Sequence, residues 1–217
     1  MGSTTYIYDD GRARKIGSGI YGEVKRANYL PKNIPAAIKI IDLNAYFRTL
    51  RRNDQEKDTY IEKIKERIDE MKKLEGNNYE NINFNKYYEN TNVEDGKLIF
   101  AMELCDFNLK KYLEENKANE GLDIGEIYEI LKQLNNTFQI MSSQNINIIH
   151  GNLKLENILI KDNKTFKLTG FEIIPELIKL TKIYQSNKIC QYLPPEILRE
   201  NYNFQIDQKT DLWSLGI

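Results

Sequence analysis

Three glycines near the start of the chain have the spacing of a loop that could bind phosphate groups. Residues 16–24 read I-G-S-G-I-Y-G-E-V, so Gly17, Gly19 and Gly22 form a G-x-G-x-x-G-x-V pattern. Because glycine lacks a Cβ atom, such a turn brings backbone N–H groups close to phosphate oxygens. A dinucleotide-binding loop shares these glycines, but that loop opens a helix. Here a strand-like segment follows, which argues against a dinucleotide-binding loop.

A cation follows the glycines on an otherwise apolar strand-like segment. Residues 36–39 read A-A-I-K and end at Lys39, fifteen residues after Val24. Taken singly, this lysine is an edge residue whose ammonium group reaches solvent. Its combination with the glycine loop favours instead an ammonium group that contacts the same phosphates.

Further blocks follow in a fixed order. Residues 150–157 read H-G-N-L-K-L-E-N, residues 170–172 read G-F-E, residues 194–196 read P-P-E, and residues 211–216 read D-L-W-S-L-G. The chain resembles the eukaryotic protein kinase domain family, whose signature is a Gly-rich loop, a strand lysine, H-R-D-x-x-x-x-N, D-F-G and A-P-E. The resemblance runs from about Tyr8 to the last residue.

The resemblance implies an α+β, protein-kinase-like fold of two lobes. Residues 8–105 would form the first lobe, with an antiparallel sheet, the Gly-rich loop, the strand lysine and one helix. Residues 106–217 would form a partial, mainly helical second lobe, cut short at the start of its central helix. We expect that lobe to be marginally stable and to leave one helix face incompletely covered, namely Ile127, Leu131, Leu134 and Phe138.

Two departures from the family pattern bear on catalysis. In the family the H-R-D aspartate accepts the substrate hydroxyl proton and the D-F-G aspartate holds magnesium. By resemblance those positions are Asn152 and Gly170. An amide does not take up a proton at neutral pH, and glycine has no side chain to bind a cation. Loss of the base alone costs a factor of about 10² to 10⁴ in rate. The resemblance thus implies a pseudokinase with no intact catalytic residue.

The resemblance also assigns a nucleotide site. Val24, Ala37 and Leu159 would enclose an adenine ring, Met102 would be the gatekeeper, and residues 103–105 the hinge. The complete set that would bind ATP or another nucleotide is Ile16, Gly17, Gly19, Gly22, Val24, Ala37, Lys39, Met102, Glu103, Cys105, Lys154, Asn157 and Leu159.

The charge balance of this site predicts an unusual dependence on metal. Loss of two aspartates, with Lys39 and Lys154 present, makes the local charge more positive. Side chains could then neutralise the phosphates in place of magnesium. We expect ATP binding that is weak to moderate and independent of magnesium or weakly dependent on it, with Asn157 as the one remaining motif ligand. The rival expectation is that Glu172 or Glu156 replaces a missing metal ligand.

A charged segment predicts the helix of the first lobe. Residues 45–75 carry apolar residues at spacings of three and four, which describes one long amphipathic helix. The family glutamate that pairs with the strand lysine falls at Arg67 in one register and at Glu66 in the other, and both registers stay open. The apolar stripe is Tyr60, Ile61, Ile64, Ile68, Met71 and Leu74.

The remaining elements follow from residue periodicity. Residues 12–42 predict three short strands in a meander, and residues 97–104 predict a buried strand. Residues 108–116 and 123–144 predict helices. A strand-rich first half and a helical second half agree with two lobes.

Composition excludes several classes of partner. The 31 basic and 32 acidic residues give a net charge of -1, so no bulk field attracts nucleic acid or a membrane. No apolar run reaches the length of a membrane span. Cys105 and Cys190 are the only cysteines, which favours a reducing compartment, cytoplasmic by default with the nucleus left open.

Three hypotheses on function remain open. The first is a catalytically silent kinase-like module that acts by binding an unidentified protein, with its nucleotide site as a sensing or structural element. The second is an active Ser/Thr protein kinase that uses displaced carboxylates. The third is a non-functional kinase fragment.

Overall fold

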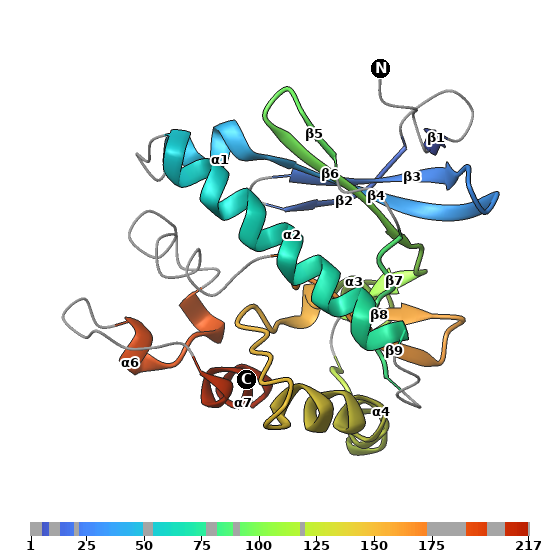
Figure 1. Cartoon of the computed structure of the whole chain (residues 1–217). Helices are drawn as coiled ribbons and strands as arrows, with labels where there is room; N and C mark the ends of the chain where they lie inside the picture. Colours follow the sequence, from blue (N-terminus) through green and yellow to red (C-terminus); the bar gives the residue numbers. More distant parts are fainter. Residues whose placement is uncertain are drawn as a thin grey trace. The chain divides into compact units, whose positions relative to one another are not determined.

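The computed structural model describes residues 6–8, 14–19, 22–49, 54–76, 82–88, 92–117, 120–172, 190–198 and 207–216 (Figure 1). The chain forms two compact units. The first comprises Met1–Lys72 and Asn85–Cys105, and the second comprises Lys73–Phe84 and Asp106–Ile217. The first unit holds the larger sheet and the second holds most of the helices, which confirms the expected α+β fold of two lobes.

The first unit contains one antiparallel sheet. Its strand order is β1-β3-β4-β6-β5 (Figure 1). Strand β2 also pairs with β3, at residues 22–25, which precede the residues of β3 that pair with β1. The meander predicted over residues 12–42 is confirmed as β2, β3 and β4, and the buried strand over residues 97–104 is confirmed as β6. The strands are β1 (Tyr6–Tyr8), β2 (Lys15–Gly19), β3 (Gly22–Tyr29), β4 (Ile34–Asp42), β5 (Asn92–Glu94) and β6 (Lys97–Glu103).

The helical part of the first unit differs from the prediction. The single helix expected over residues 45–75 is wrong, because the segment forms α1 (Leu43–Thr49) and α2 (Asp54–Gly76). The Asp42 carboxylate accepts a hydrogen bond from the backbone N–H of Ala45 at 2.8 Å and so caps the start of α1. The apolar stripe that motivated the prediction belongs to α2 alone, where Ile61, Ile64, Ile68, Met71 and Leu74 are buried.

The second unit combines helices with a small antiparallel sheet of order β7-β8-β9. The helices predicted over residues 108–116 and 123–144 are confirmed as α3 and α4. The Asn108 side chain caps α3, and Asp123 and Glu126 form a capping box at the start of α4. The elements are β7 (Phe107–Asn108), α3 (Leu109–Asn116), α4 (Ile124–Ser142), the 3₁₀ helix η2 (Leu155–Asn157), β8 (Ile158–Lys161), β9 (Thr165–Leu168), the 3₁₀ helix η3 (Cys190–Tyr192), α6 (Pro195–Leu198) and α7 (Gln208–Leu215).

Helix α4 has one buried face and one exposed apolar face. Leu134 is fully buried, whereas the side chains of Ile127 and Leu131 are 43% and 40% exposed. The expectation of an incompletely covered face therefore holds for Ile127 and Leu131 and is wrong for Leu134, because Leu134 points into the core of the unit.

No helix within the described ranges has both the length and the hydropathy that a membrane crossing requires.

Candidate functional site

A buried carboxylate holds the start of the segment that resembles a catalytic loop. Asp211 of α7 accepts hydrogen bonds from the backbone N–H groups of His150, at 2.8 Å, and Gly151, at 2.7 Å. Asp211 is 7% exposed, so its charge is compensated by these two donors rather than by water. Gly151 has a φ of 70°, a conformation that favours glycine. The loop is thus fixed to a helix about sixty residues away in the chain.

Both nitrogens of His150 are engaged in structural contacts. Its Nε2 lies 3.0 Å from the carbonyl oxygen of Thr169, and its Nδ1 accepts a hydrogen bond from the backbone N–H of Asn152 at 3.2 Å. The proton of the neutral ring therefore sits on Nε2 and is donated to a carbonyl. The ring also packs on Phe171, with centroids 4.4 Å apart. This geometry gives His150 a positioning role and leaves no nitrogen for a general base.

The two departures from the family pattern lie together in the second unit, beside Asn157. The Asn157 side chain donates from Nδ2 to the backbone carbonyl oxygen of Asn152 at 2.7 Å, and the backbone carbonyl oxygen of Asn157 accepts from the N–H of Thr169 at 3.0 Å. Gly170 has a φ of 98°, and a Cβ atom there would lie only 2.7 Å from Asn157 Nδ2. The amide of Asn157 therefore fills the space next to Gly170.

These residues do not fit a magnesium ion held as in the family. Magnesium prefers carboxylate and carbonyl oxygens in near-octahedral geometry. Gly170 offers no side-chain oxygen and Asn152 offers only a neutral amide, so neither supplies a carboxylate; Asn157, held through its Nδ2, offers one amide oxygen. The described residues hold no group of three or more Asp, Glu, His or Cys side chains arranged for a metal.

The candidate replacement carboxylates lie in different surroundings. Glu156 forms an ion pair with Lys110 of α3, with Oε1 and Nζ 2.9 Å apart. Burial raises the pKa of the Glu156 carboxyl, but the hydrogen bond from Lys110, a backbone hydrogen bond and the charges of Lys154 and Lys110 outweigh it, so the pKa is lowered. Glu172 is fully buried. Glu156 therefore already has an ion-pair partner, Lys110, within its own unit.

The glycines of the first unit divide into one that packing requires and two that it does not. A Cβ atom at Gly22 would lie 2.1 Å from the carbonyl oxygen of Ile40 in β4, so only glycine fits there. A Cβ atom at Gly17 would make ordinary contact with Val24, and one at Gly19 would meet none of the described residues within 4 Å. Packing among the described residues therefore does not require glycine at either position.

One face of the sheet carries several residues assigned to the nucleotide site. Val24 and Lys39 are cross-strand partners, as are Ala37 and Met102, and Ala37 and Lys39 lie two residues apart on β4. Since paired residues share a face and side chains alternate along a strand, these four lie on one face. The opposite face packs a separate core that includes Tyr29, Ile38 and Ile99.

The hinge candidates continue from the end of β6. Glu103 is buried, and its backbone N–H donates to the carbonyl oxygen of Lys86 at 2.8 Å. The thiol of Cys105 is free of disulfide bonds and lies 3.5 Å from Asn85 Oδ1.

The remaining candidates for the nucleotide site lie on other elements. Ile16 is 41% exposed at the bulge of β2. In the second unit, Lys154 precedes η2, and Leu159 lies on β8 opposite Lys167.

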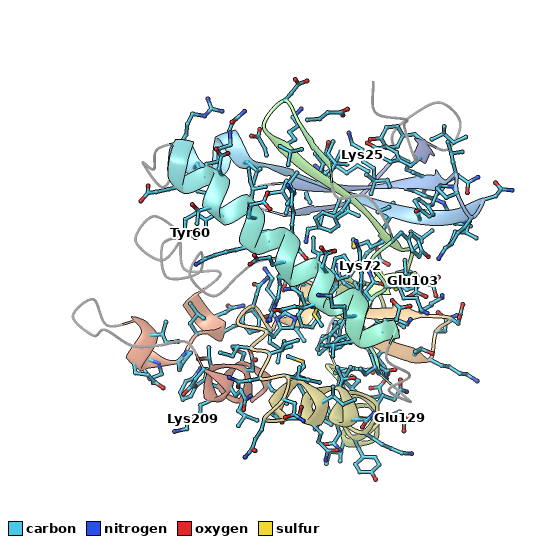
Figure 2. The ribbon with its side chains drawn as sticks, viewed as in Figure 1. Lys25, Tyr60, Lys72, Glu103, Glu129 and Lys209 are labelled. Atoms are coloured by element: carbon cyan, nitrogen blue, oxygen red, sulfur yellow. The ribbon has the colours of Figure 1, made fainter. Side chains whose placement is uncertain are left out.

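The two candidates on α2 differ in burial within the first unit. Arg67 lies beside the buried stripe with 13% of its side chain exposed, and its Nη1 is 3.3 Å from Glu70 Oε2. Glu66 is exposed. Arginine rather than glutamate therefore lies at the inward position of the helix (Figure 2 shows α2 between its labelled residues Tyr60 and Lys72).

Two features of this site were missed by sequence reasoning. The ion pair between Lys110 and Glu156 joins residues far apart in the chain and leaves no pattern in the sequence. The contact of Asp211 with the loop is equally remote, although Asp211 begins the block D-L-W-S-L-G that contributed to the resemblance.

Comparison with known proteins agrees with the geometry. The family profile described as "Protein kinase domain" matches residues 11–217. Calcium-dependent protein kinase 5 of Plasmodium falciparum is 29% identical over 208 residues, which cover 94% of this chain and 32% of that protein. Cyclin-dependent kinase 2 of Caenorhabditis elegans is 27% identical over 205 residues, 94% of this chain and 50% of that protein.

A third relative, actin-regulating kinase 1 of Saccharomyces cerevisiae, is 25% identical over 166 residues, 71% of this chain and 26% of that protein. The chain thus spans half or less of the length of these relatives. The family match extends from the Gly-rich loop to α7 and includes every block on which the resemblance was based. The chain therefore belongs to the protein kinase domain family.

Proposed function

We propose that this kinase domain is a pseudokinase, which binds ATP or another nucleotide without efficient phosphoryl transfer and acts by binding a protein partner. The observation that carries the proposal is the arrangement at Asn152 and Gly170. An amide stands at the position of the base, and the Asn157 side chain fills the space next to the glycine. Phosphoryl transfer depends on positioning and charge neutralisation, so the loss of both groups leaves little turnover.

The magnitude of the loss is large. General-base assistance contributes a factor of about 10² to 10⁴, or roughly 3 to 5 kcal/mol of the barrier. The absence of a carboxylate ligand for magnesium adds to this loss. Glu156 is paired with Lys110, but the two side chains are 34% and 44% exposed and such a pair costs little to break, so Glu156 is the carboxylate that an active enzyme would use as a replacement.

Nucleotide binding is supported by the first unit. Gly19 has no described residue within 4 Å of a Cβ position, and Lys39 shares a sheet face with Val24, Ala37 and Met102. The glycine loop would bind phosphates through backbone N–H groups, and Lys39 would supply a positive charge. We propose that this binding depends little on magnesium.

Two measurements test the proposal. Transfer of radioactive γ-phosphate to a generic peptide substrate is compared between wild type, Asn152→Asp and the double variant Asn152→Asp/Gly170→Asp. The expected result is no transfer by wild type, and transfer by wild type at an ordinary kinase rate would overturn the pseudokinase assignment. Calorimetric titration of ATP with magnesium or with EDTA tests the metal dependence, with Lys39→Ala as the variant that should weaken binding in both buffers.

A further inference from the structure

Lys39 and helix α2 lie on the same face of the sheet in the first unit. Lys39 pairs with Phe100 of β6 and therefore shares a face with Phe100 and with Leu98, two residues earlier on β6. Both of these residues are buried. On the opposite face, the core cluster of the described residues contains no residue of α2. The buried stripe of α2 therefore packs on the face that carries Lys39.

Lys39 and Arg67 lie at the same level of this face. Helix α1 starts at Leu43, directly after β4, and the ring of its Phe47 contacts the ring of Tyr60 on α2, with centroids 5.6 Å apart. Lys39 lies three residues before the end of β4, and Arg67 lies seven residues after Tyr60. At 3.3 Å per strand residue and 1.5 Å per helix residue, each is about 10 Å from the corner at α1. Since β4 runs toward this corner and α2 runs away from it, the two residues face each other (Figure 1).

The side chain of Arg67 belongs to the inward side of α2. It is 13% exposed, and at about 100° per residue its position around the helix falls between those of Leu74 and Met71, which are both buried. Its Nη1 lies 3.3 Å from Oε2 of Glu70, whose side chain is 53% exposed. A pair with a partner this exposed is worth little. The guanidinium group has several N–H donors, so it can bind a further anion.

Two positive charges on one partly buried face favour a bound anion. Like charges that lie close together raise each other's free energy, and an anion that contacts both removes this cost. In the family the strand lysine pairs with a glutamate of this helix, so the sign of the charge at the helix position is reversed here. The residues around Gly170 do not fit a magnesium ion held as in the family, so a bound nucleotide would bring phosphates whose charge no metal ion neutralises.

From these observations we propose that Arg67 binds the phosphates of a nucleoside triphosphate together with Lys39, and so takes over the charge neutralisation that magnesium provides in the family. A guanidinium group contacts two phosphate oxygens at once through its planar fork, and the charge strengthens both hydrogen bonds. The ammonium group of Lys39 adds a second cation from the facing strand. This proposal rests on the nucleotide binding proposed above and names the residue that makes that binding independent of metal. It does not require phosphoryl transfer.

The test is calorimetric titration of the complete chain with ATP, ADP and AMP, each in EDTA and in magnesium. The variants are Arg67→Met and Arg67→Glu, with Lys65→Met and Lys65→Glu as matched controls on the same helix. Lys65 pairs with Glu62 and has 34% of its side chain exposed. It lies two positions before Arg67 and therefore about 160° away around the helix. Circular dichroism and urea unfolding of each variant identify any loss of fold.

In EDTA we expect Arg67→Met to weaken ATP binding about tenfold to hundredfold, because a charge-assisted contact with two phosphate oxygens is lost. AMP has fewer phosphate oxygens, so the ratio of ATP affinity to AMP affinity should fall as well, whereas a purely structural role would weaken all three nucleotides alike. Arg67→Glu should bind ATP more weakly still in EDTA and should gain more affinity from magnesium than wild type. The Lys65 variants should stay within about twofold of wild type. If Arg67→Glu does not fold, Arg67→Met against Lys65→Met decides.

Equal ATP affinities of wild type and Arg67→Met in EDTA, equal losses from the Arg67 and Lys65 variants, or equal losses for ATP, ADP and AMP would each overturn the role of Arg67. In all three outcomes wild type still binds ATP without metal, so the proposed nucleotide binding stands. Binding by wild type that requires magnesium, or no binding at all, rejects the metal-independent binding and the role of Arg67 with it. Phosphoryl transfer, measured on the same preparations, judges the pseudokinase assignment separately.

Discussion

Substitution of Gly170 by alanine should destabilise the domain by an amount that its surroundings define. The residue has a φ of 98°, and a left-handed backbone of this kind costs any residue with a Cβ atom roughly 1 to 2 kcal/mol. The added Cβ atom would lie 2.7 Å from Asn157 Nδ2 and would displace an amide that donates to the carbonyl oxygen of Asn152. Loss of such a bond in a residue only 8% exposed adds about 1 to 2 kcal/mol.

The expected total is therefore about 2 to 4 kcal/mol, measured as the change in the free energy of unfolding in urea. Gly121→Ala is the matched control, because Gly121 also has a positive φ, 67°, but a Cβ atom there meets nothing within 4 Å. It should show the backbone cost alone. In an Asn157→Ala background, Gly170→Ala should likewise lose its contact component, which makes a double-mutant cycle the decisive measurement.

A coupling energy near zero between Gly170 and Asn157, or equal costs for Gly170→Ala and Gly121→Ala, would refute the reasoning. The result also bears on the phosphotransfer assay. Aspartate at position 170 has the same Cβ atom, so a restored carboxylate should come at a cost in stability. Unfolding curves for Asn152→Asp/Gly170→Asp are therefore needed before a lack of activity in that variant is attributed to chemistry.

Three further predictions concern single contacts. Asp211→Asn should destabilise the second unit by about 2 to 4 kcal/mol in urea unfolding, since one acceptor for the N–H groups of His150 and Gly151 becomes a donor; a neutral effect would contradict the proposed anchoring. Gly22→Ala should prevent or severely weaken folding, whereas Gly19→Ala should leave the melting temperature unchanged, and equal effects would contradict the packing argument. The pKa of Glu156 is lowered in the folded state, so its ionised form stabilises the fold above the ordinary pKa of 4.5. This stability is lost as the pH falls through the lower folded pKa. Below pH 4.5 the melting temperature should therefore fall less in Lys110→Met than in wild type.

Residue patterns predicted the parts of the fold that depend on local chemistry. Helices α3 and α4 were found because their apolar spacing and their caps, Asn108 and Asp123, lie within the helices' own sequence. The division of this segment into α1 and α2 was not predicted, because its charged residues suit a helix throughout.

The β8–β9 hairpin was also missed, although the sequence contains a signal for it. Asp162 and Asn163 have φ values of 53° and 56°, which fit a tight hairpin turn between two runs of β-branched and aromatic residues. The hairpin's turn and strands line a cavity beside α3 and α4 in the second unit.

The site itself could be predicted only as a set of residue types. The losses at Asn152 and Gly170 are visible in the sequence, but the contact of Asn157 with the space beside Gly170 depends on backbone geometry. The choice between Arg67 and Glu66 likewise required the burial of α2, because a shift of one residue on a helix rotates a side chain by about 100°. Spacing alone could not decide between the two.

Two substitutions in this domain, Asn152 and Gly170, fall on groups that would act on phosphate or its metal, and they give the proposed pseudokinase assignment its physical basis. Asp211, whose targets are backbone N–H groups, holds the loop whether or not chemistry takes place. His150 positions the backbone of Asn152 and packs on Phe171, contacts that also need no substrate. A loop built in this way keeps its geometry without a base or a metal, so loss of transfer need not entail loss of fold. The second unit can therefore keep its fold in a protein that acts by binding rather than by catalysis.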